Sequence, residues 1–446
     1  MTRVLILASQ SPRRSELLKL AGYAFRQVSV QLSEIPDENL NPAERIRQLA
    51  YAKAKACLEM RIPSEIKDFG LVSADTLVVL GDKTLGKPKG EQEACQMLRQ
   101  LSGKTHQVIT SVVIYDSTTE RFYAGEGVTH VTFRVLSDAD IQEYVATGDP
   151  FDKAGAYGIQ GYASRFVNSI QGDFDNVVGF PMQIFEQLRA NAGIEFERSL
   201  FALEVMSTRL SDIRSQISVA VENTGRTRAA KTSQGVRLIA VSKTKPIEAV
   251  VNALRSGQLV FGENYVQEAV VKQQEVQAAL RLLGRTDLKP EWHFIGQLQT
   301  NKVKEVVGKF DLIHSVDRFK LAEAISKRSV EKGVTTRILI QVNVAGEETK
   351  GGTSMDQAVS LVQDAMKLRH VVVAGLMCMP PLDGSAAMHF QRTRKLFESI
   401  RAQMKDDEKK QYFSELSMGT THDFVEAIQE GSTLIRVGTA IFGERT

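Results

Sequence analysis

The chain has 446 residues, of which 43% are hydrophobic and 24% are charged, and it carries a formal net charge of +3. This balance excludes a disordered chain, no apolar run is long enough to span a bilayer, and the small net charge argues against nucleic-acid binding. The chain is too long for one ordinary domain and shows no signal peptide, so we expect a two-domain cytoplasmic protein without membrane or nucleic-acid partners.

The first part of the chain predicts a mixed α/β domain. An apolar strand at residues 4–8 leads through a polar turn into a helical pattern. We expect helices at 15–21, 42–60, 91–101 and 138–146, and strands at 71–73, 76–80, 107–115 and 128–135. A helical pattern over 185–205 weakens at 191–193, and residues 206–208 (MST) resemble a new protein start. We therefore place the domains at 1–197 and 207–446, with a linker at 198–206.

The second part of the chain contains eight short apolar runs, each followed by a helix-like stretch. The runs are residues 237–242, 259–262, 292–295, 311–315, 337–344, 371–378, 413–418 and 434–437. Strands that alternate with helices in this number predict a (β/α)8 barrel. In such a barrel, ligands bind where the strands end and the βα-loops begin.

Four polar clusters lie outside the apolar strands of the first domain. They occupy residues 9–14, 74–76, 86–88 and 153–161. Together they supply cations for phosphates, a carboxylate for a metal ion or water, and amide and hydroxyl groups that can read a base. Lys53, Lys87 and Arg14 can neutralise a polyphosphate, and Glu34 is a candidate second carboxylate beside a metal ion. This inventory suits phosphoryl chemistry on a nucleotide.

The same segments, in this order, resemble the Maf (septum formation inhibitor) family. They are residues 7–14 (LASQSPRR), 74–76 (ADT), 86–88 (GKP), 101–106 (LSGKTH), 152–161 (DKAGAYGIQG) and 176–181 (NVVGFP). The resemblance implies a nucleoside triphosphate pyrophosphatase that uses a divalent metal ion, Mg²⁺ or Mn²⁺, and releases a monophosphate and pyrophosphate. The family often forms dimers, so a homodimer through this domain is a further expectation.

The resemblance assigns the proton acceptor and the specificity positions of the first domain, and the chemistry of the residues gives the remaining candidates. Asp75 would be the proton acceptor, with Lys53 and Lys87 beside it, and Glu34 and Asp75 would hold the metal ion. Ser9 and Arg14 would bind phosphate, and the specificity positions would be Arg13, Thr76 and Gln160. The ADT and YGIQG segments resemble the branch that acts on dTTP and UTP. The alternatives are the branch that acts on 7-methyl-GTP and a non-enzymatic regulator of septation.

The predicted barrel gathers at one mouth the groups that pyridoxal phosphate (PLP) needs. Lys243 follows the first strand and offers an amine for the aldehyde, although Lys245 competes for this role. Glycines after the seventh and eighth strands let backbone amides approach a phosphate, and an arginine can face the ring. The candidate cofactor-binding residues are Lys243, Asn264, Ser417, Gly419, Arg436, Gly438 and Thr439. The histidines, by contrast, are scattered without a ligand cluster.

This half resembles the pyridoxal phosphate homeostasis protein family from residue 207 to 445. The matching segments are residues 240–246 (AVSKTKP), 261–268 (FGENYVQE), 293–302 (HFIGQLQTNK), 417–419 (SMG) and 435–443 (IRVGTAIFG). The resemblance implies a fold-type III barrel that holds PLP on Lys243 as an internal aldimine. Arg436 would face the pyridine nitrogen, keep it unprotonated and so disfavour carbanion chemistry.

Two departures and one alternative accompany this second resemblance. Thr420 and Thr421 stand where the family commonly has Met and Ser, and Lys350, a candidate second amine, lies in an altered loop. Threonine retains the hydroxyl, so phosphate binding is expected to survive. The alternative is an amino-acid racemase, but racemases of this fold carry a further β-domain that we do not find here. We therefore expect a cofactor carrier without robust turnover.

Overall fold

The computed structural model describes residues 2–30, 40–60, 66–159, 161–224, 235–346, 351–381 and 383–444. The chain forms two compact units, which divide between Ala202 and Leu203, with residues 278–286 grouped with the first. Among the described residues, no helix combines the length and the apolarity that a bilayer crossing needs.

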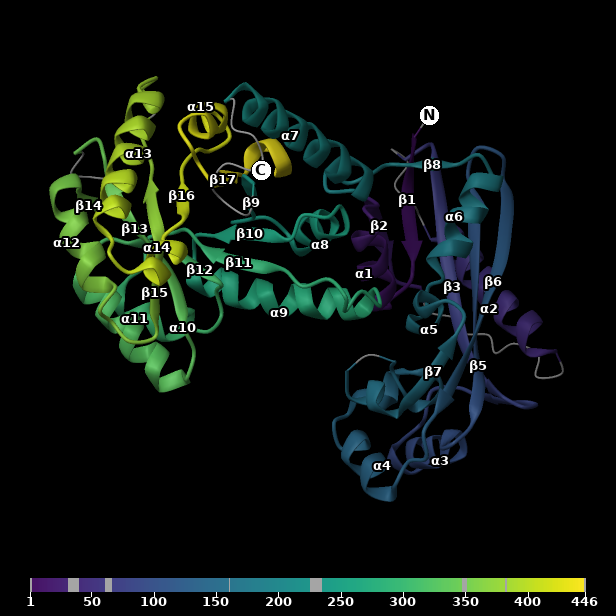
Figure 1. The fold of residues 1–446 in the computed structure, drawn as a ribbon. Coiled ribbons are helices and arrows are strands. Elements are labelled where there is room, and N and C mark those ends of the chain that lie inside the picture. Colours follow the sequence, from purple (N-terminus) through teal and green to yellow (C-terminus); the bar gives the residue numbers. More distant parts are fainter. Residues whose placement is uncertain are drawn as a thin grey trace. The chain divides into compact units, whose positions relative to one another are not determined.

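The first unit is built on one mixed sheet with the order β2-β1-β3-β5-β6-β7 (Figure 1). The long strands on this path are β1 (Thr2–Ala8), β3 (Phe69–Leu80), β5 (Thr105–Asp116) and β6 (Arg121–Phe133), and the short ones are β2 (Phe25–Val28) and β7 (Val167–Gln171). β1 is parallel to β2 and β3, whereas β3, β5, β6 and β7 run antiparallel. Two further strands, β4 (Lys83–Leu85) and β8 (Glu195–Phe196), pair with β3 and β1.

The two strands expected at 71–73 and 76–80 are one continuous strand. Ala74 and Asp75 stay in register with Val112 and Ser111 of β5, so the polar residues do not interrupt the ladder. The helix expected over 185–205 is also divided. α6 (Met182–Asn191) ends before Gly193, whose φ of +65° suits glycine, and α7 (Leu203–Asn223) begins after β8. Met206 is therefore a buried residue in the first turns of a helix.

Helices cover the sheet of the first unit. α2 (Pro42–Glu59) packs Ala50, Ala54 and Cys57 against Leu71 and Val113 of the sheet. α5 (Phe174–Val178) lies by β5 and β6, where Asn176 Nδ2 donates to the Val108 carbonyl at 2.9 Å. The remaining helices of the unit are α1 (Pro12–Leu20), α3 (Glu91–Leu101), α4 (Asp138–Val145), η1 (Asp149–Asp152), η2 (Ala154–Ala156) and η3 (Gly161–Phe166).

The second unit is a closed barrel of eight parallel strands, as the sequence predicted. The strands are β9 (Arg237–Val241), β10 (Val260–Glu263), β11 (Glu291–Phe294), β12 (Leu312–Val316), β13 (Thr336–Asn343), β15 (Val371–Cys378), β16 (Glu415–Ser417) and β17 (Leu434–Val437). Closure follows because β17 pairs with β9 and β12 pairs with β13. A short strand, β14 (Thr353–Ser354), adds to β13.

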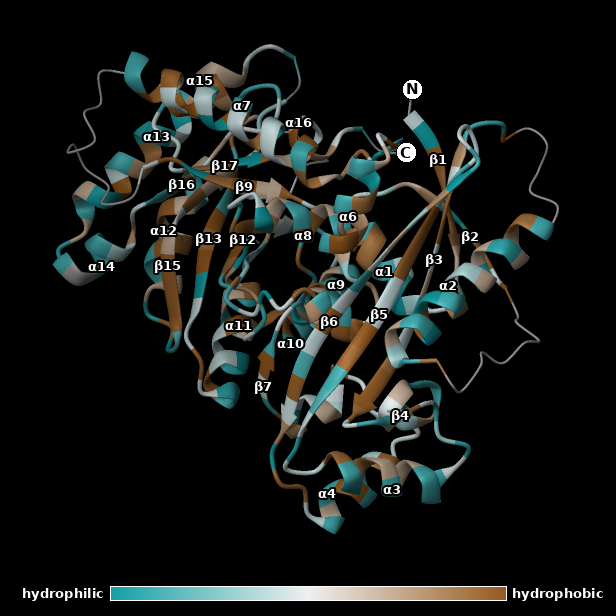
Figure 2. Ribbon diagram, turned by 90° about the vertical axis from the view of Figure 1, so that its right-hand side faces the viewer, coloured by the Kyte–Doolittle hydropathy of each residue, from teal (hydrophilic) through white to brown (hydrophobic). Residues whose placement is uncertain are grey.

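Helix α7 precedes the first barrel strand and further helices follow the strands, while apolar side chains from different strands fill the interior. The helices are α7, α8 (Ile247–Arg255), α9 (Val266–Leu282), η4 (Thr300–Lys302), α10 (Val303–Val306), α11 (Phe319–Lys332), α12 (Met355–Ala365), α13 (Ala386–Gln403), α14 (Asp407–Tyr412), α15 (Phe424–Gln429) and α16 (Thr439–Phe442). Ile239, Leu312, Leu339 and Leu434 meet in one buried cluster. Figure 2 shows hydrophobic residues along many of the strands, whereas the helices alternate between hydrophobic and hydrophilic residues.

Candidate functional sites

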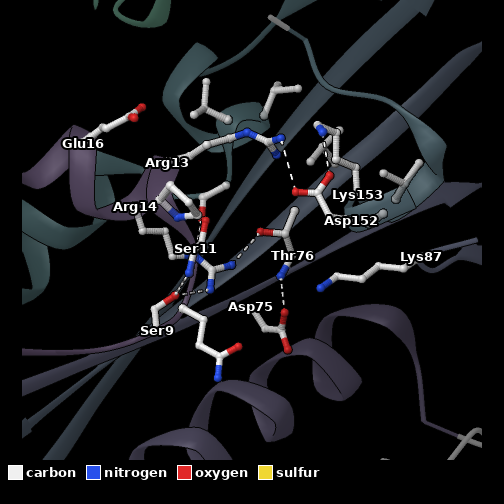
Figure 3. Close-up of a pocket in the computed structure, with 18 of the residues that line it drawn as sticks. Ser9, Ser11, Arg13, Arg14, Glu16, Asp75, Thr76, Lys87, Asp152 and Lys153 are labelled. Carbon is white, nitrogen blue, oxygen red and sulfur yellow. Dashed lines mark hydrogen bonds and ion pairs between the residues drawn. The ribbon is translucent and has the colours of Figure 1, made fainter. Parts of the chain in front are cut away.

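The four polar clusters of the first unit surround one cavity of about 650 Å³. The turn after β1 contributes Ser9, and the start of α1 contributes Arg13. α2 contributes Lys53, and β3 contributes Asp75 and Thr76. Figure 3 shows Asp75, Lys87, Arg13 and Asp152 around this opening. Residues distant in the sequence are thus brought together by the pairing of β1 with β3 and by the packing of α2 on β3.

Asp75 and Thr76 are adjacent in β3, and their side chains therefore leave opposite faces of the sheet. Asp75 faces α2, where its Oδ2 atom accepts a hydrogen bond from Lys53 Nζ at 2.8 Å. Its Oδ1 atom accepts from the Thr76 backbone N–H at 2.9 Å. Burial lowers the pKa of Lys53 despite the neighbouring Asp75 carboxylate. The pair remains partly open to solvent, with about a quarter of each side chain exposed.

Thr76 belongs to a short hydrogen-bond chain on the other face. Its hydroxyl accepts from Arg14 Nη2 at 3.3 Å and lies 3.0 Å from Thr110 Oγ1. Because the Thr110 hydroxyl donates to the Asn176 carbonyl at 3.1 Å, the Thr76 hydroxyl is the donor in its contact with Thr110. The orientation of the Thr76 hydroxyl is therefore fixed by its neighbours.

Arg14 is a buried clamp beside the cavity. It donates to the carbonyls of Gly179 at 2.9 Å and Ala74 at 2.7 Å, and to the hydroxyls of Ser9 at 3.2 Å and Thr76 at 3.3 Å. Burial lowers the pKa of Arg14 from its ordinary value. Most of its N–H donors are engaged by protein atoms, so few are left for a substrate phosphate. The structure thus gives Arg14 a positioning function, and its predicted phosphate contact stays a prediction.

Arg13 points to a different cluster of charges. Its guanidinium lies 3.9 Å from an Asp152 carboxylate oxygen, and Asp152 also pairs with the buried Lys153 at 2.6 Å. Lys153 is further held by Asp149, and this group borders a smaller cavity of about 220 Å³ lined also by Tyr157. Asp152 and Lys153 belong to one of the segments that carry the first resemblance, but no function was predicted for these two residues. The feature of the sequence that could have revealed them is an acidic residue next to a basic residue within a motif.

Lys87 is exposed at the edge of the large cavity, and among the described residues no ion pair engages it. Glu34, Gln160 and Lys350 lie outside the described residues. Within the described part of the chain, no group of three or more His, Cys, Asp or Glu residues has the arrangement of a metal site. Asp75 is the carboxylate that faces the cavity beside Lys53, and Mg²⁺ is commonly held by few carboxylates together with substrate phosphates. Asp75 fits such a metal ion.

The carboxyl ends of the barrel strands carry the second set of predicted residues. Lys243 is half-buried directly after β9, and Thr244 next to it has a φ of +59°. Lys245 is engaged elsewhere, because its Nζ atom donates to the carbonyls of Gly443 at 3.0 Å and Glu444 at 2.7 Å. The choice of Lys243 over Lys245 as the amine for a ligand at the mouth stays a prediction.

The loops beside Lys243 form a small polar cradle. The Asn264 Oδ1 atom is buried, and no described residue donates a hydrogen bond to it. Gly419 has a φ of +92°, and a Cβ there would lie 2.6 Å from Ala427 Cβ. Thr421 accepts from the Gly438 N–H at 3.3 Å and from the Thr439 hydroxyl at 3.1 Å, so the altered residue reaches this loop. The glycine-lined turn fits a phosphate, because backbone N–H groups can approach its oxygens there, and the orphaned Asn264 oxygen could accept a hydrogen bond from a donor on the same ligand.

Arg436 lies inside the barrel on β17 and is only 4% exposed. It donates to the Ser417 hydroxyl and, at 2.9 Å, to the Cys378 carbonyl. Burial lowers its pKa from the ordinary value. Ser417 also contacts His314, which in turn contacts His293. His293 and His314, which are far apart in the sequence, therefore lie side by side in the barrel. The feature of the sequence that could have revealed them is a polar residue within each of two apolar strands.

Comparisons with known proteins match two separate segments of the chain, one on each side of the division between the two units. Residues 4–191 match the family described as Maf-like protein, and residues 219–446 match the alanine racemase N-terminal domain. A dTTP/UTP pyrophosphatase of Bdellovibrio bacteriovorus is 44% identical over 42% of this chain and 98% of its own length. A pyridoxal phosphate homeostasis protein of Aquifex aeolicus is 40% identical over 53% of this chain and 97% of its own.

A solved structure resembles the barrel. The PipY structure of Synechococcus elongatus with PLP bound is 33% identical, covers 53% of this chain and 100% of its own, and gives a TM-score of 0.43. Each of these relatives matches one half of the chain and nearly all of itself.

Proposed function

Because the chain belongs to the Maf-like family through its first unit and to the pyridoxal phosphate homeostasis proteins, within the alanine racemase N-terminal domain family, through its second, we propose a two-function protein. The first unit hydrolyses nucleoside triphosphates to a monophosphate and pyrophosphate. The second unit binds and delivers PLP. The observation that carries the first function is the Asp75–Lys53 pair at 2.8 Å in a cavity bordered by further cations.

In the proposed reaction, Asp75 orients the attacking water and accepts its proton. A divalent metal ion held by Asp75 and the substrate phosphates would neutralise charge on the oxygens. Lys53 keeps the Asp75 carboxylate in place and, with Lys87, adds positive charge where negative charge develops. Arg14 fixes the β1–α1 turn against β3, so the position of Thr76 relative to Asp75 is set before substrate binds.

We propose dTTP and UTP as the substrates. The support is the dTTP/UTP activity named for the relatives that match the first unit at 44% and 46% identity. Arg13 and Thr76 line the cavity, and Arg13 also borders the smaller cavity next to Tyr157, where a base would be read. A pyrimidine differs from 7-methylguanine in size and in its hydrogen-bonding edge, so pocket shape decides the choice.

The test measures pyrophosphate release by the full-length protein from dTTP, UTP, CTP and 7-methyl-GTP with Mg²⁺ or Mn²⁺. Asp75→Asn should reduce release from dTTP and UTP by at least about 10²-fold, because it removes the proton acceptor. Asp82→Asn is the matched control, because this substitution makes the same chemical change at an exposed position after β3. No Asp75-dependent release from any nucleotide would leave the first unit a non-enzymatic module.

For the second unit, we propose that Lys243 supplies the amine that holds PLP. The glycine-lined loop at 417–419 and the N–H groups near Gly438 would receive the phosphate, and Arg436 would meet the ring nitrogen. Bound PLP supplies an electron sink, and a guanidinium at its ring nitrogen weakens that sink. This residue set favours storage and delivery of the cofactor over racemisation.

Borohydride treatment followed by peptide mass analysis tests this assignment. A pyridoxyl group should be found on the peptide with Lys243, and it should be lost in Lys243→Ala but retained in Lys245→Ala. Measurable racemisation of alanine or other amino acids by the wild-type protein would instead support an amino-acid racemase.

A further inference from the structure

A continuous chain of hydrogen bonds crosses the interior of the barrel. It begins at Arg436 on β17, passes to Ser417 at the end of β16, and reaches His314 Nδ1 on β12 at 3.0 Å. His314 Nε2 lies 3.0 Å from His293 Nδ1, and His293 Nε2 lies 2.8 Å from Glu291 Oε1. β16 and β12 are not neighbours in the sheet, so the Ser417–His314 contact runs through the barrel core.

The direction of every bond in this chain follows from its two ends. A carboxylate only accepts, so His293 carries its proton on Nε2, and its Nδ1 is an acceptor when the ring is neutral. His314 must then donate through Nε2 and accept at Nδ1. The Ser417 hydroxyl therefore donates to His314 and accepts from Arg436, which is a donor only. All donors thus point from the guanidinium toward the carboxylate.

The surroundings keep both rings neutral, as this arrangement requires. His293 and His314 have no exposed surface, and burial lowers the pKa of each. For His314 the nearby His293 and Arg436 act in the same direction. Burial raises the pKa of Glu291, but its bonds to His293 and Arg237 outweigh this effect and hold that pKa at about 2. The far end of the chain therefore stays a carboxylate at neutral pH.

The chain also links the two ends of the barrel. Arg436 and Ser417 lie with the loops at the carboxyl ends of the strands. Glu291 begins β11, pairs with Arg237 at 2.6 Å, and lines a cavity of about 950 Å³ together with Arg237 and Glu415. Among the described residues, no carboxylate bonds directly to Arg436. The Asp423 carboxylate acts on Arg436 through space, whereas the chain joins Arg436 to the Glu291 carboxylate through hydrogen bonds.

We propose that Ser417, His314, His293 and Glu291 are positioning residues that fix the orientation and the donor strength of Arg436 toward the cofactor ring. Aligned hydrogen bonds polarise one another, so the Glu291 charge is felt at the guanidinium through neutral groups. Loss of that charge makes Arg436 a stronger donor. The statement about the ring rests on the proposed PLP function, whereas the bond directions do not.

The bond directions are tested without cofactor by NMR of the full-length protein labelled with ¹⁵N-histidine. At pH 7, both His293 and His314 should show a protonated Nε2 and an unprotonated Nδ1. His293→Gln and His314→Gln assign the signals. A proton on Nδ1 of either ring, or a doubly protonated ring, would overturn the proposal. The result is read from the wild-type spectrum, and the Nε2–Nδ1 contact between the two rings gives a second means of assignment, so a variant that fails to fold does not remove the test.

The effect on the ring is tested with PLP labelled with ¹⁵N at the pyridine nitrogen. In Glu291→Gln, the resonance of bound PLP should move upfield, toward that of a protonated pyridine, because Arg436 donates more strongly. Glu415→Gln is the matched control: it neutralises a carboxylate that lines the same cavity and accepts from Thr433 at 2.7 Å, outside the chain. The resonance of PLP bound to Glu415→Gln should stay at the wild-type position.

Equal resonances in all three proteins would overturn the coupling, and so would equal shifts in both variants. Glu291→Asp provides a second variant, which keeps the charge but shortens the reach to His293, and it should give a shift smaller than that of Glu291→Gln. Failure of the wild-type protein to bind PLP would reject the proposed cofactor function, while the histidine spectrum would still decide the bond directions.

Discussion

At the scale of single residues, adjacent positions have different functions because they leave opposite faces of one element. Asp75 faces Lys53 on α2, whereas Thr76 faces Arg14 and Thr110. The two arginines at the start of α1 divide in the same way. Arg14 is buried and held by four hydrogen bonds, and Arg13 is partly exposed and borders both cavities.

This division predicts that the same substitution affects stability at Arg14 and nucleotide preference at Arg13. Arg14→Lys loses the fork of donors that joins Gly179 to Ala74, and it should destabilise the first unit by about 2–4 kcal/mol. Arg13→Lys should change stability by less than about 0.5 kcal/mol but alter the preference among nucleotides. Thermal unfolding and pyrophosphate release on both variants check this. Equal destabilisation of the two would contradict the clamp function of Arg14.

His106 gives the first unit a defined response to acid. The ring is buried and contacts the Tyr157 hydroxyl at 2.7 Å, and burial lowers its pKa to about 4. The unfolded chain binds a proton at about pH 6.5, so folding opposes protonation. The contribution of His106 to the free energy of unfolding is fully present above pH 6.5. It is lost as the pH falls from 6.5 toward 4, and the loss reaches up to about 3 kcal/mol.

His106→Gln should remove this part of the pH dependence. Glutamine retains a partner for Tyr157 but does not titrate in this range. Urea unfolding of the first unit at pH 7 and pH 5 measures the difference for each protein. A variant that loses as much stability as the wild type between these two values would show that His106 is not the group responsible.

At the scale of elements, the barrel depends on close approach between β15 and β16. Gly375 has a φ of +153°, and a Cβ there would lie 1.8 Å from the Glu415 carbonyl oxygen. Gly375 pairs with Glu415 in register, two residues before Ser417. A side chain at this position would push β16 away and displace the hydroxyl that contacts Arg436.

Gly375→Ala should therefore destabilise the barrel by more than about 2 kcal/mol and weaken PLP binding. Gly235→Ala is the control, because among the described residues beyond its chain neighbours no atom lies within 4 Å of the Cβ position, and its φ is not positive. Denaturant unfolding and PLP titration by absorbance measure both variants. If the Gly375 and Gly235 variants are equally stable, the strands tolerate the side chain and the close contact is not required.

At the scale of the whole molecule, the chain consists of two units with separate cores and separate sites. The buried cluster of Ile6, Leu71 and Val113 belongs to the first unit, and that of Ile239, Leu312 and Leu434 belongs to the second. A ligand stabilises only the structure that binds it. The two proposed ligands should thus act on different unfolding events.

Calorimetry is done on the full-length Asp75→Asn variant, in which turnover is blocked. PLP should raise the temperature of one unfolding transition, and dTTP should raise the temperature of another. A ligand present at about 100 times its Kd adds about 2.7 kcal/mol to the unit that binds it. If either ligand raises both transitions equally, the units are thermodynamically coupled and the two-unit description needs revision.

The sequence by itself determined the eight barrel strands in chain order, the long strands β1, β5 and β6 of the first unit, and both family resemblances. These properties are local, because apolar spacing along the chain specifies an element and a motif specifies a turn. It also placed Asp75, Lys53 and Lys243 among the candidate site residues.

The tertiary structure alone decided how the side chains are used. It joined two expected strands into β3, engaged Lys245 with the carbonyls after α16, and committed Arg14 to protein partners. It also aligned His293 and His314 between Arg436 and Glu291. These outcomes depend on contacts between residues far apart in the chain, and such contacts exist only after the sheet and the barrel have formed.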